Sequence, residues 1–368
     1  MSTPSLDDHA EPVAGLAPAL VAEVKRAVDA RLHNVVEGAL RDAVKAGSEP
    51  AAMVDALAGL VRRGGKRLRP ALVAAAYAAS GRSLAPLPSA LVDVGVAFEL
   101  LQAYFLVHDD WMDGDRERRG GPSVHAALEA RHGNPHLGAS LAVLAGDLAS
   151  GLAHEVLAAM TAPAGVVVRV MREFARMEQM VVLGQSLDLT LGADADPDAV
   201  DRMHARKTGS YTVRGPLLIG ALLGEASQDV VAALDRFGAP LGIAFQLRDD
   251  LLGTFGDPSE TGKPVGSDLR AGKRTALVAS ALARCAPADR VRLQAILADA
   301  THPARLAPVT DEDIGYAMQL FETCGARAAL EARIDALAAE ARAALFGLPP
   351  DAVELLLALE AAMVQRSR

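Results

Sequence analysis

Apolar residues recur every three or four positions along most of the chain, which is the spacing of helices with one buried face. The first such segment runs from Ala19 to Lys45 and carries Val24, Val28 and Leu32 at this spacing. No segment shows the two-residue alternation of a half-buried strand, so we predict an all-α protein. Further helices are predicted over residues 51–61, 70–79, 88–113, 123–132, 135–160, 164–191, 197–223, 228–250, 274–286, 288–298, 311–323, 327–345 and 351–364.

Polar and glycine-rich breaks separate these helices. The longest, GTFGDPSETGKPVGSD, runs from Gly253 to Asp268 and is too polar for core and too long for a simple turn, so we expect a functional loop. Asp249 and Asp250 are expected to end the helix before it. Residues 1–18 are predicted to form a loose tail, and no other break is long enough to divide the chain. The pattern therefore predicts one domain over residues 19–368, a helical bundle around a deep central cavity.

Composition narrows the possible classes of protein. Hydrophobic residues make up 51% of the chain and aromatic residues 4%, and such an Ala- and Leu-rich chain favours helix. The net charge of −9 argues against a general nucleic-acid binder. Cys285 and Cys324 are too few for a disulfide framework. The N-terminus lacks the basic and apolar regions of a signal peptide, and no uncharged apolar run reaches about 18 residues. We expect a cytoplasmic protein without membrane insertion.

The first chemical signal is the segment ELLQAYFLVHDDWMDGDRERRGGPSVH, from Glu99 to His125. In a helix Asp109 and Asp113 stand four residues apart and share one face, where two carboxylates repel each other. A cation between them relieves this repulsion, and oxygen ligands on a rigid helix suit Mg²⁺, which completes its shell with water and phosphate oxygens. The following Arg118 and Arg119 suit a diphosphate. The alternative is a solvated acidic helix end.

A second acidic pair, Asp249–Asp250 in FQLRDDLLG, also follows a long apolar helix. Helical bundles build metal sites from side chains on facing helices, so the two acidic segments can face one another. A single lysine is usually a solvated surface charge, but basic residues fall in several loops: Lys66, Arg69, Lys207, Lys263 and Lys273. Together they suggest two anionic groups, one bridged by metal and one held by Lys and Arg alone. No nucleotide-binding glycine motif follows a strand.

From about Val54 onward the chain resembles the all-trans isoprenyl diphosphate synthases, the farnesyl and geranylgeranyl diphosphate synthase family. The motifs that carry the resemblance are GGKRLRP, ELLQ…HDDWMD…RRGGP, GQSLDL, KT and FQLRDDLLGTFGDPSETGKPVGSDLRAGKRT, in this order. The resemblance implies a homodimeric prenyltransferase that condenses isopentenyl diphosphate with an allylic diphosphate such as dimethylallyl or geranyl diphosphate. It also implies three magnesium ions, which manganese could replace.

The resemblance assigns roles residue by residue. The metal motifs correspond to Asp109, Asp110, Asp113, Asp249 and Asp250. The positions that hold the allylic diphosphate are Arg118, Lys207 and Lys273, and those that hold isopentenyl diphosphate without metal are Lys66, Arg69, Gln102 and Arg119. Lys263 is a further basic candidate for substrate binding. Thr208 and Gln246 correspond to groups that steady the allylic cation, Gln185 and Asp188 to a supporting pair, and Arg366 and Arg368 to a closing C-terminal tail.

Two features bear on the details of this resemblance. Many family members carry a third aspartate four residues after Asp249, where this chain has Gly253, so we expect water, Asp250 or Asp268 to support Asp249. Tyr104 and Phe105 lie about one turn before Asp109, where their side chains would block a growing chain; ordinary core aromatics are the alternative. Two aromatics there favour a C15 product, farnesyl diphosphate, with the C20 geranylgeranyl diphosphate as the alternative.

Two other functions, those of a terpene cyclase and of a non-catalytic synthase subunit, agree less well with these motifs. A class I terpene cyclase shares the helical cavity and the DDxxD pattern, but it would carry an Asn/Asp-Ser/Thr-Glu metal motif in place of FQLRDDLLG. A non-catalytic subunit of a hetero-oligomeric synthase should have lost aspartates or arginines, whereas both acidic sites and the cations are intact here.

Overall fold

The computed structural model describes residues 16–191, 197–257, 265–270, 272–273, 275–301 and 309–365. Residues 1–15 of the predicted tail, Lys263, Arg366 and Arg368 lie outside the described residues. The first helix begins at Leu16, so the predicted tail boundary at residue 18 falls inside it.

The first half of the chain forms a series of helices interrupted by one very short hairpin. Its elements are α1 (Leu16–Ala46), α2 (Ser48–Arg62), α3 (Leu68–Ala79), α4 (Ser89–Asp113), β1 (Glu117–Arg118), β2 (Gly121–Pro122), α5 (Val124–His132) and α6 (Pro135–Ala159). The two antiparallel strands pair Glu117 with Pro122 and Arg118 with Gly121.

The second half is helical throughout its described elements. These are α7 (Ala164–Thr190), α8 (Pro197–His204), η1 (Ala205–Arg214), α9 (Gly215–Leu223), α10 (Gln228–Phe255), α12 (Ser267–Arg270), α13 (Ala276–Arg284), α14 (Pro287–Thr301), α15 (Asp311–Thr323), α16 (Ala326–Ala343) and α17 (Pro350–Val364). The all-α prediction is confirmed.

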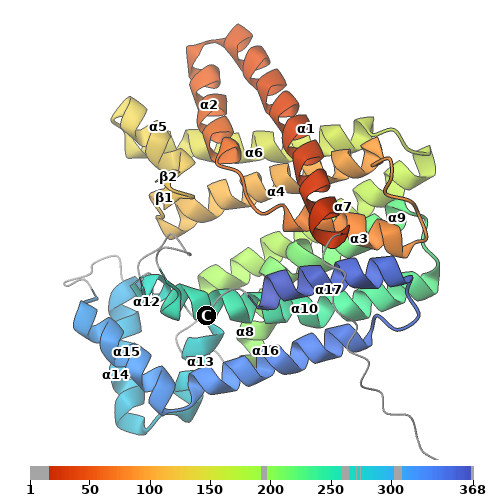
Figure 1. The fold of residues 1–368 in the computed structure, drawn as a ribbon. Coiled ribbons are helices and arrows are strands. Elements are labelled where there is room, and N and C mark those ends of the chain that lie inside the picture. The colour runs from red at the N-terminus through yellow and green to blue at the C-terminus, as the bar shows by residue number, and fades with distance from the viewer. Residues whose placement is uncertain are drawn as a thin grey trace, which may run out of the picture.

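The long helices pack side by side around the middle of the molecule (Figure 1). Helix α4 packs on α6, α3 packs on α9, and α10 packs on both η1 and α16. The buried apolar side chains form two clusters, one centred on α4, α6 and α7 and the other on α10, α13 and α16. Helices α3 and α9 contribute to both clusters, because Leu72 and Leu217 face one and Val73 and Ile219 face the other.

Several helix ends follow directly from the sequence. The side chains of Asn134 and Ser227 accept hydrogen bonds from backbone N–H groups at the starts of α6 and α10, as expected of N-caps. Thr310 and Asp313 form a reciprocal capping box at the start of α15. Gly114 ends α4 with φ of 72°, a left-handed conformation that glycine adopts without strain.

One predicted helix end falls too early, and another predicted helix is not α-helical throughout. Helix α10 continues five residues beyond Asp250, to Phe255, because its apolar face continues through buried Leu251 and Thr254. The predicted helix over 197–223 contains a π-helical segment, η1, between α8 and α9. Such wider turns are uncommon and occur frequently at functional sites.

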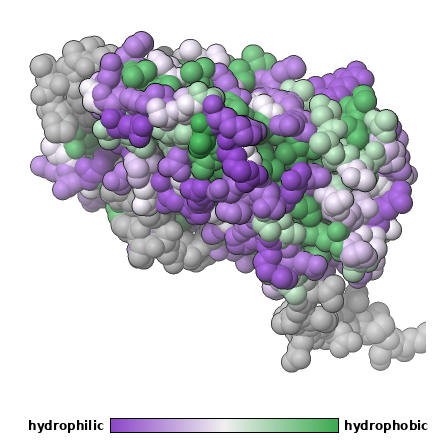
Figure 2. All heavy atoms as spheres, turned by 90° about the horizontal axis from the view of Figure 1, so that it is seen from above, coloured by the Kyte–Doolittle hydropathy of each residue, from purple (hydrophilic) through white to green (hydrophobic). Residues whose placement is uncertain are grey.

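Three helices, α4, α6 and α10, are long and apolar enough to cross a membrane by length and composition alone. The most apolar windows of α4 and α10 are 72% and 56% buried within the bundle, and that of α6 is 39% buried. The apolar surfaces of α4 and α10 are therefore mostly used in internal packing. Seen from above, the surface carries hydrophobic groups interspersed among hydrophilic residues (Figure 2).

Candidate active site

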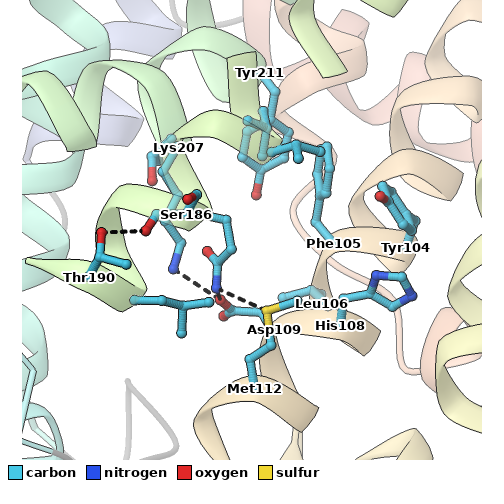
Figure 3. A pocket seen from close by; sticks show the side chains of 15 residues that line it. Tyr104, Phe105, Leu106, His108, Asp109, Met112, Ser186, Thr190, Lys207 and Tyr211 are labelled. Carbon is cyan, nitrogen blue, oxygen red and sulfur yellow. Dashed lines mark hydrogen bonds and ion pairs between the residues drawn. The ribbon is translucent and has the colours of Figure 1, made fainter. Parts of the chain in front are cut away.

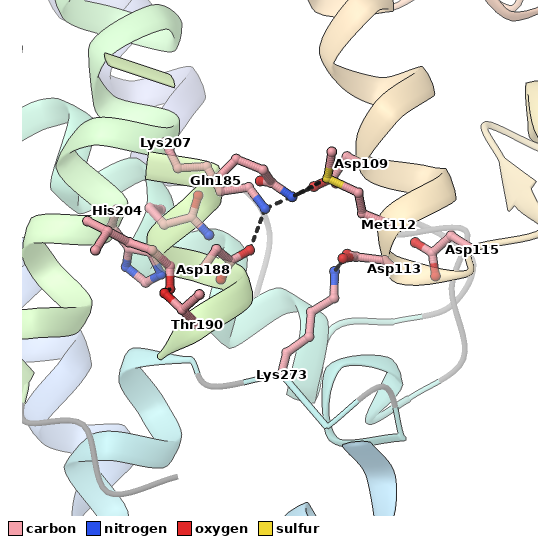
Figure 4. A network of polar contacts seen from close by, with 12 residues as sticks. Asp109, Met112, Asp113, Asp115, Gln185, Asp188, Thr190, His204, Lys207 and Lys273 are labelled. Carbon is pink, nitrogen blue, oxygen red and sulfur yellow. Dashed lines mark hydrogen bonds and ion pairs between the residues drawn. The ribbon is translucent and has the colours of Figure 1, made fainter. Parts of the chain in front are cut away.

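Asp109 and Asp113 lie on one face of α4 and meet cations from other parts of the chain (Figure 4). The ammonium group of Lys207 on η1 donates to Asp109 Oδ1 at 2.9 Å and to Asp188 Oδ2 on α7 at 2.5 Å. The Nζ atom of Lys273 lies 3.0 Å from Asp113 Oδ2. Gln185 Nε2 on α7 donates to Asp109 Oδ1 at 3.0 Å. The fold thus gathers residues as far apart in the sequence as Asp109 and Lys273, 164 positions (273 − 109).

Close helix packing positions Lys207. Gly184 on α7 faces the backbone of η1, and a Cβ atom added there would lie 2.3 Å from the Lys207 nitrogen. Because a real Cβ does not approach backbone this closely, glycine is required for α7 and η1 to pack at this distance. The glycine of the GQSLDL motif therefore lets Lys207 reach across to Asp109.

The charges in this network stabilise one another. Burial would raise the pKa of Asp109, but neighbouring Lys207 outweighs it and holds that pKa below its usual value. Burial would lower the pKa of Lys207, yet Asp109 and Asp188 raise it. The pair is consequently an ionised carboxylate and ammonium. For Asp113 burial prevails over Lys273 and the pKa is raised.

Asp110 has a different environment from Asp109. Its side chain is buried and accepts a hydrogen bond from Arg118 Nε at 2.7 Å, while Arg118 Nη2 also reaches Asp115 at 3.0 Å. Burial raises the pKa of Asp110 to about 6, against the opposing effect of Arg118. This pairing fixes the turn after α4, and neither Asp110 nor Arg118 lines the two cavities described below.

The second acidic pair divides in the same way. Asp249 lines a polar cavity, whereas Asp250 is buried and accepts hydrogen bonds from Gln246 Nε2 at 2.9 Å and from the Ala276 N–H at 2.8 Å. Burial raises the pKa of Asp250 to about 7. Asp250 thus ties α10 to the start of α13, and Asp249 is the member of the pair that faces the cavity.

Asp268 occupies the space that a side chain at position 253 would need. A Cβ atom added to Gly253 on α10 would lie 1.9 Å from Asp268 Oδ2 on α12. The position where many relatives carry a third aspartate is therefore filled by a carboxylate from a different helix. This placement agrees with the expectation that Asp268 supports the second acidic site.

The polar cavity has a volume of about 440 Å³ and collects most of the predicted substrate-binding residues. Arg119 donates to the Gly64 carbonyl, and Arg69 Nη2 donates to Thr212 Oγ1 at 2.8 Å. Among the described residues, the buried Arg69 Nε atom has no hydrogen-bond partner. The predicted residues that line this cavity are Lys66, Arg69, Gln102, Asp109, Arg119, Lys207, Thr208, Gln246, Asp249 and Lys273.

An adjoining cavity of about 340 Å³ is mainly apolar (Figure 3). Tyr104 and Phe105 of α4 line it, as do Val181 and Leu189 of α7. The two cavities have four lining residues in common: Asp109, Lys207, Thr208 and Tyr211. The polar cavity, which is also the charged one, therefore meets the apolar cavity at the end of α4. This arrangement suits a molecule with an anionic head and a hydrocarbon tail.

The donor set fits a divalent cation bound together with a ligand. Asp109, Asp113 and Asp249 offer hard carboxylate oxygens, and the ammonium groups of Lys207 and Lys273 already supply positive charge at the first two. Within the described ranges no group of three or more His, Cys, Asp or Glu side chains forms a ready metal cage.

Comparison with known proteins identifies the family. Residues 50–312 match the family described as "Polyprenyl synthetase". The chain belongs to this family. As a polyprenyl synthetase it is a prenyltransferase, as the motifs indicated. It is 38% identical over 274 residues to the (2E,6E)-farnesyl diphosphate synthase of Mycobacterium tuberculosis, covering 73% of this chain and 70% of the relative. It is 39% identical over 220 residues to the geranylgeranyl diphosphate synthase of the same organism, covering 59% of each chain.

Solved structures support the same assignment. A geranylgeranyl pyrophosphate synthase from Corynebacterium glutamicum, complexed with isoprenyl diphosphate and magnesium, aligns with a TM-score of 0.87 and 33% sequence identity, covering 94% of this chain and 99% of that one. A polyprenyl synthetase from Streptomyces coelicolor aligns with a TM-score of 0.80 and 28% identity. This polyprenyl synthetase thus shares the fold of solved structures named geranylgeranyl pyrophosphate synthase and polyprenyl synthetase.

Tyr211 was not predicted as a site residue from the sequence. It stands four residues after Lys207 in the segment KTGSY, lines both cavities and contacts Arg69 and Phe105. An aromatic residue one turn beyond a predicted active-site lysine was the available signal.

Proposed function

We propose that this polyprenyl synthetase condenses isopentenyl diphosphate with dimethylallyl and geranyl diphosphates to form farnesyl diphosphate. The observation that carries the proposal is the junction of the charged cavity with an apolar cavity lined by Tyr104 and Phe105. The diphosphates occupy the charged cavity, and the growing hydrocarbon chain extends along α4 into the apolar one.

The allylic diphosphate binds where α4 faces α10. Asp109, Asp113 and Asp249 hold Mg²⁺, which we expect as three ions and which Mn²⁺ could replace. When bound, this metal supplies positive charge to the leaving diphosphate. Lys207 and Lys273, now on Asp109 and Asp113, lie close enough to donate to the same diphosphate. Asp110 and Arg118 act by fixing the turn that positions Asp113.

Isopentenyl diphosphate binds through cations alone. Lys66, Arg69 and Arg119 line the polar cavity together with Gln102, so three cationic side chains face the space that a diphosphate would fill. Charge-assisted hydrogen bonds from arginine to phosphate are strong and directional. This arrangement holds the second substrate beside the first with its double bond toward the junction.

The reaction begins when the allylic C–O bond breaks and the diphosphate leaves with the bonding electrons. Oxygen atoms of Thr208 and Gln246, at the boundary of the charged cavity, face the carbon that becomes positive. The apolar cavity keeps water from this cation until the isopentenyl double bond attacks. Glu99 also lines the cavity but is paired with Arg67, so we propose that the departed diphosphate accepts the final proton.

Product analysis tests this proposal. Wild-type enzyme with Mg²⁺, labelled isopentenyl diphosphate and, in turn, dimethylallyl, geranyl or farnesyl diphosphate should give a mainly C15 product from the first two. Phe105→Ala and Tyr104→Ala should lengthen the apolar cavity and shift the product toward C20. If the wild type makes mainly C20 from farnesyl diphosphate, the enzyme is a geranylgeranyl diphosphate synthase and the two aromatic residues do not stop the chain.

We also propose that the enzyme is a cytoplasmic homodimer. Large apolar side chains are exposed on the neighbouring helices α6 and α7, which is the kind of surface that a second subunit covers. They are Leu137, Leu144, Val168, Met180, Val182, Leu183, Leu187 and Leu189. Light scattering coupled to size-exclusion chromatography should give twice the chain mass of 38.2 kDa, and Leu144→Glu should lower it; a monomeric wild type would contradict the proposal.

A further inference from the structure

Tyr211 stands where the charged and apolar cavities meet. It lies on the π-helical segment η1 and lines both cavities. Its ring lies beside Phe105, with the hydroxyl directed into the apolar cavity (Figure 3). Of the four residues common to the two cavities, Asp109, Lys207 and Thr208 already have roles in the proposed reaction, and Tyr211 has none.

On the charged side, Tyr211 supports Arg69. The guanidinium carbon of Arg69 lies 4.3 Å from the centre of the Tyr211 ring, a cation–π contact. The next residue, Thr212, accepts a hydrogen bond from Arg69 Nη2 at 2.8 Å. These two contacts from η1 hold the guanidinium in place while its Nε atom stays without a partner in the described structure.

On the apolar side, Tyr211 supports Phe105. Their ring centres lie 5.1 Å apart with an interplanar angle of 75°, the edge-to-face geometry that aromatic pairs prefer. Phe105 contacts Tyr104 at 4.8 Å, and Tyr104 contacts His108 at 4.7 Å. A continuous row of rings therefore runs from Arg69 to the proposed floor of the apolar cavity.

The far end of this row is anchored as firmly as the near end. His108 Nε2 donates to the Val143 carbonyl of α6 at 3.0 Å. At the near end η1 packs tightly on α7 at Gly184. Between these ends, the Tyr211 ring contacts both Arg69 and Phe105.

We propose that Tyr211 is a positioning residue that couples the metal-free diphosphate site at Arg69 to the chain-length stop at Phe105. The inference rests on the proposed function, because it takes Arg69 to hold isopentenyl diphosphate and Phe105 to end the chain. Tyr211 acts through these two side chains. Removal of its ring should change both the affinity for isopentenyl diphosphate and the product length. The first property belongs to the diphosphate site at Arg69, and the second to the end of the hydrocarbon chain at Phe105.

The test compares Tyr211→Ala, Tyr211→Leu and Tyr211→Phe. Tyr211→Ala should raise the KM for isopentenyl diphosphate about fivefold, as expected from the loss of a cation–π contact of about 1 kcal/mol, and should raise the share of products longer than those of the wild type. Tyr211→Leu fills much of the space, so it should raise the KM with a smaller change in product length. Tyr211→Phe keeps the ring, so its KM for isopentenyl diphosphate and its product length should equal those of the wild type.

The double variant Phe105→Ala/Tyr211→Ala adds a second measurement. Because Tyr211 sets product length through Phe105, the double variant should give the same product distribution as Phe105→Ala alone. Tyr77→Ala, which removes a tyrosine of α3 outside both cavities, serves as the control and should leave the KM and the product length unchanged.

Several outcomes would overturn the inference. If Tyr211→Ala and Tyr211→Leu lower only kcat or melting temperature, at unchanged KM and product length, the residue has a structural role alone. Additive shifts in the double variant would show that Tyr211 acts on chain length independently of Phe105. A wild type that transfers no prenyl group would instead refute the proposed function, so the two failures are distinguishable before any variant is made.

Discussion

Asp109 and Asp110 are neighbours in the sequence and have opposite roles in the structure. One residue is about 100° of rotation on an α-helix, so Asp109 faces the cavity while Asp110 turns into the protein and binds Arg118. Asp249 and Asp250 repeat this division on α10. The sequence predicted all four as metal ligands, because a motif alone does not show which member of a pair the fold turns inward.

Substitution of Asp109 tests the metal site. Asp109→Asn removes the charge that Lys207 and a metal ion would share, so activity should fall by at least ~100-fold while helix content, measured by circular dichroism, is retained. Asp93→Asn is the matched control: Asp93 lies on the same helix but pairs with Arg31. Near-normal turnover of Asp109→Asn with Mg²⁺ would refute the role of this carboxylate.

Substitution of Arg119 separates the two substrate sites. Removal of one charged contact to phosphate costs about 2 kcal/mol, so Arg119→Ala should raise the KM for isopentenyl diphosphate by about 30-fold with little change in the allylic KM. Lys66→Ala should act in the same direction. The control is Arg82→Ala, because Arg82 donates to the Gly224 carbonyl away from both cavities. A rise in the allylic KM alone would reverse the assignment of the two sites.

Asp250 should make stability depend on pH. Burial raises its pKa from 3.8 to about 7 in the folded protein, so unfolding releases a proton across this interval. The free energy of unfolding should therefore fall as pH rises from about 4 to about 7 and level off above that.

Urea unfolding in EDTA at several pH values checks this expectation. Asp250→Asn, which cannot titrate, should lose part of the decline in unfolding free energy, whereas the surface substitution Asp42→Asn should keep it. Equal pH dependence in Asp250→Asn and the wild type would contradict the burial of an ionisable group at this position.

At the scale of elements, α12 supplies a carboxylate to the space beside Gly253 of α10. From the sequence, Gly253 was expected to leave the second acidic motif without a third aspartate, and Asp268 was one of the groups expected to support it. The sequence could not show that Asp268 occupies the same space, because the path of the loop between them is not encoded in local periodicity.

This packing predicts that restoring the family's aspartate will be harmful. In Gly253→Asp the new side chain must displace Asp268, and overpacking of this kind costs about 1–3 kcal/mol. The melting temperature should fall, and adding Asp268→Ala should recover part of the loss. Gly151→Asp on α6, where an added Cβ meets nothing within 4 Å, is the control. A Gly253→Asp variant as stable as the wild type would show that α12 can move away from position 253 without loss of stability, and would contradict this prediction.

Helix type followed from the sequence more readily than helix ends. Residues 311–323 were predicted with the boundaries that α15 has, because the Thr310 cap and the apolar period agree. The π-helical turns of η1 could not be predicted, since a segment of ten residues is too short for its wider period to stand out in the apolar pattern. Tyr211 was missed for this reason: its position across from Arg69 and Phe105 depends on the extra residue in each turn.

At the scale of the whole molecule, the all-α architecture was predictable from composition and period. The division of the buried apolar side chains into two clusters was not predictable from the sequence. The charged cavity is lined from both halves, with Asp109 from α4 beside one apolar cluster and Asp249 from α10 beside the other. Which helices face each other depends on packing between segments distant in sequence. The similar ends of two apolar helices and the family motifs pointed to the pairing of the two acidic sites, but not to the clusters beside them.

Lys207 and Lys273 give the resting enzyme its own counter-ions, seated on Asp109 and Asp113. A metal ion that arrives alone must displace an ammonium group, and a diphosphate that arrives alone must approach carboxylates. If both bind as proposed, each lysine would exchange a carboxylate for phosphate oxygens, and the carboxylates would be free to hold the metal. The two ligands should therefore load cooperatively, and each must raise the affinity for the other by the same factor.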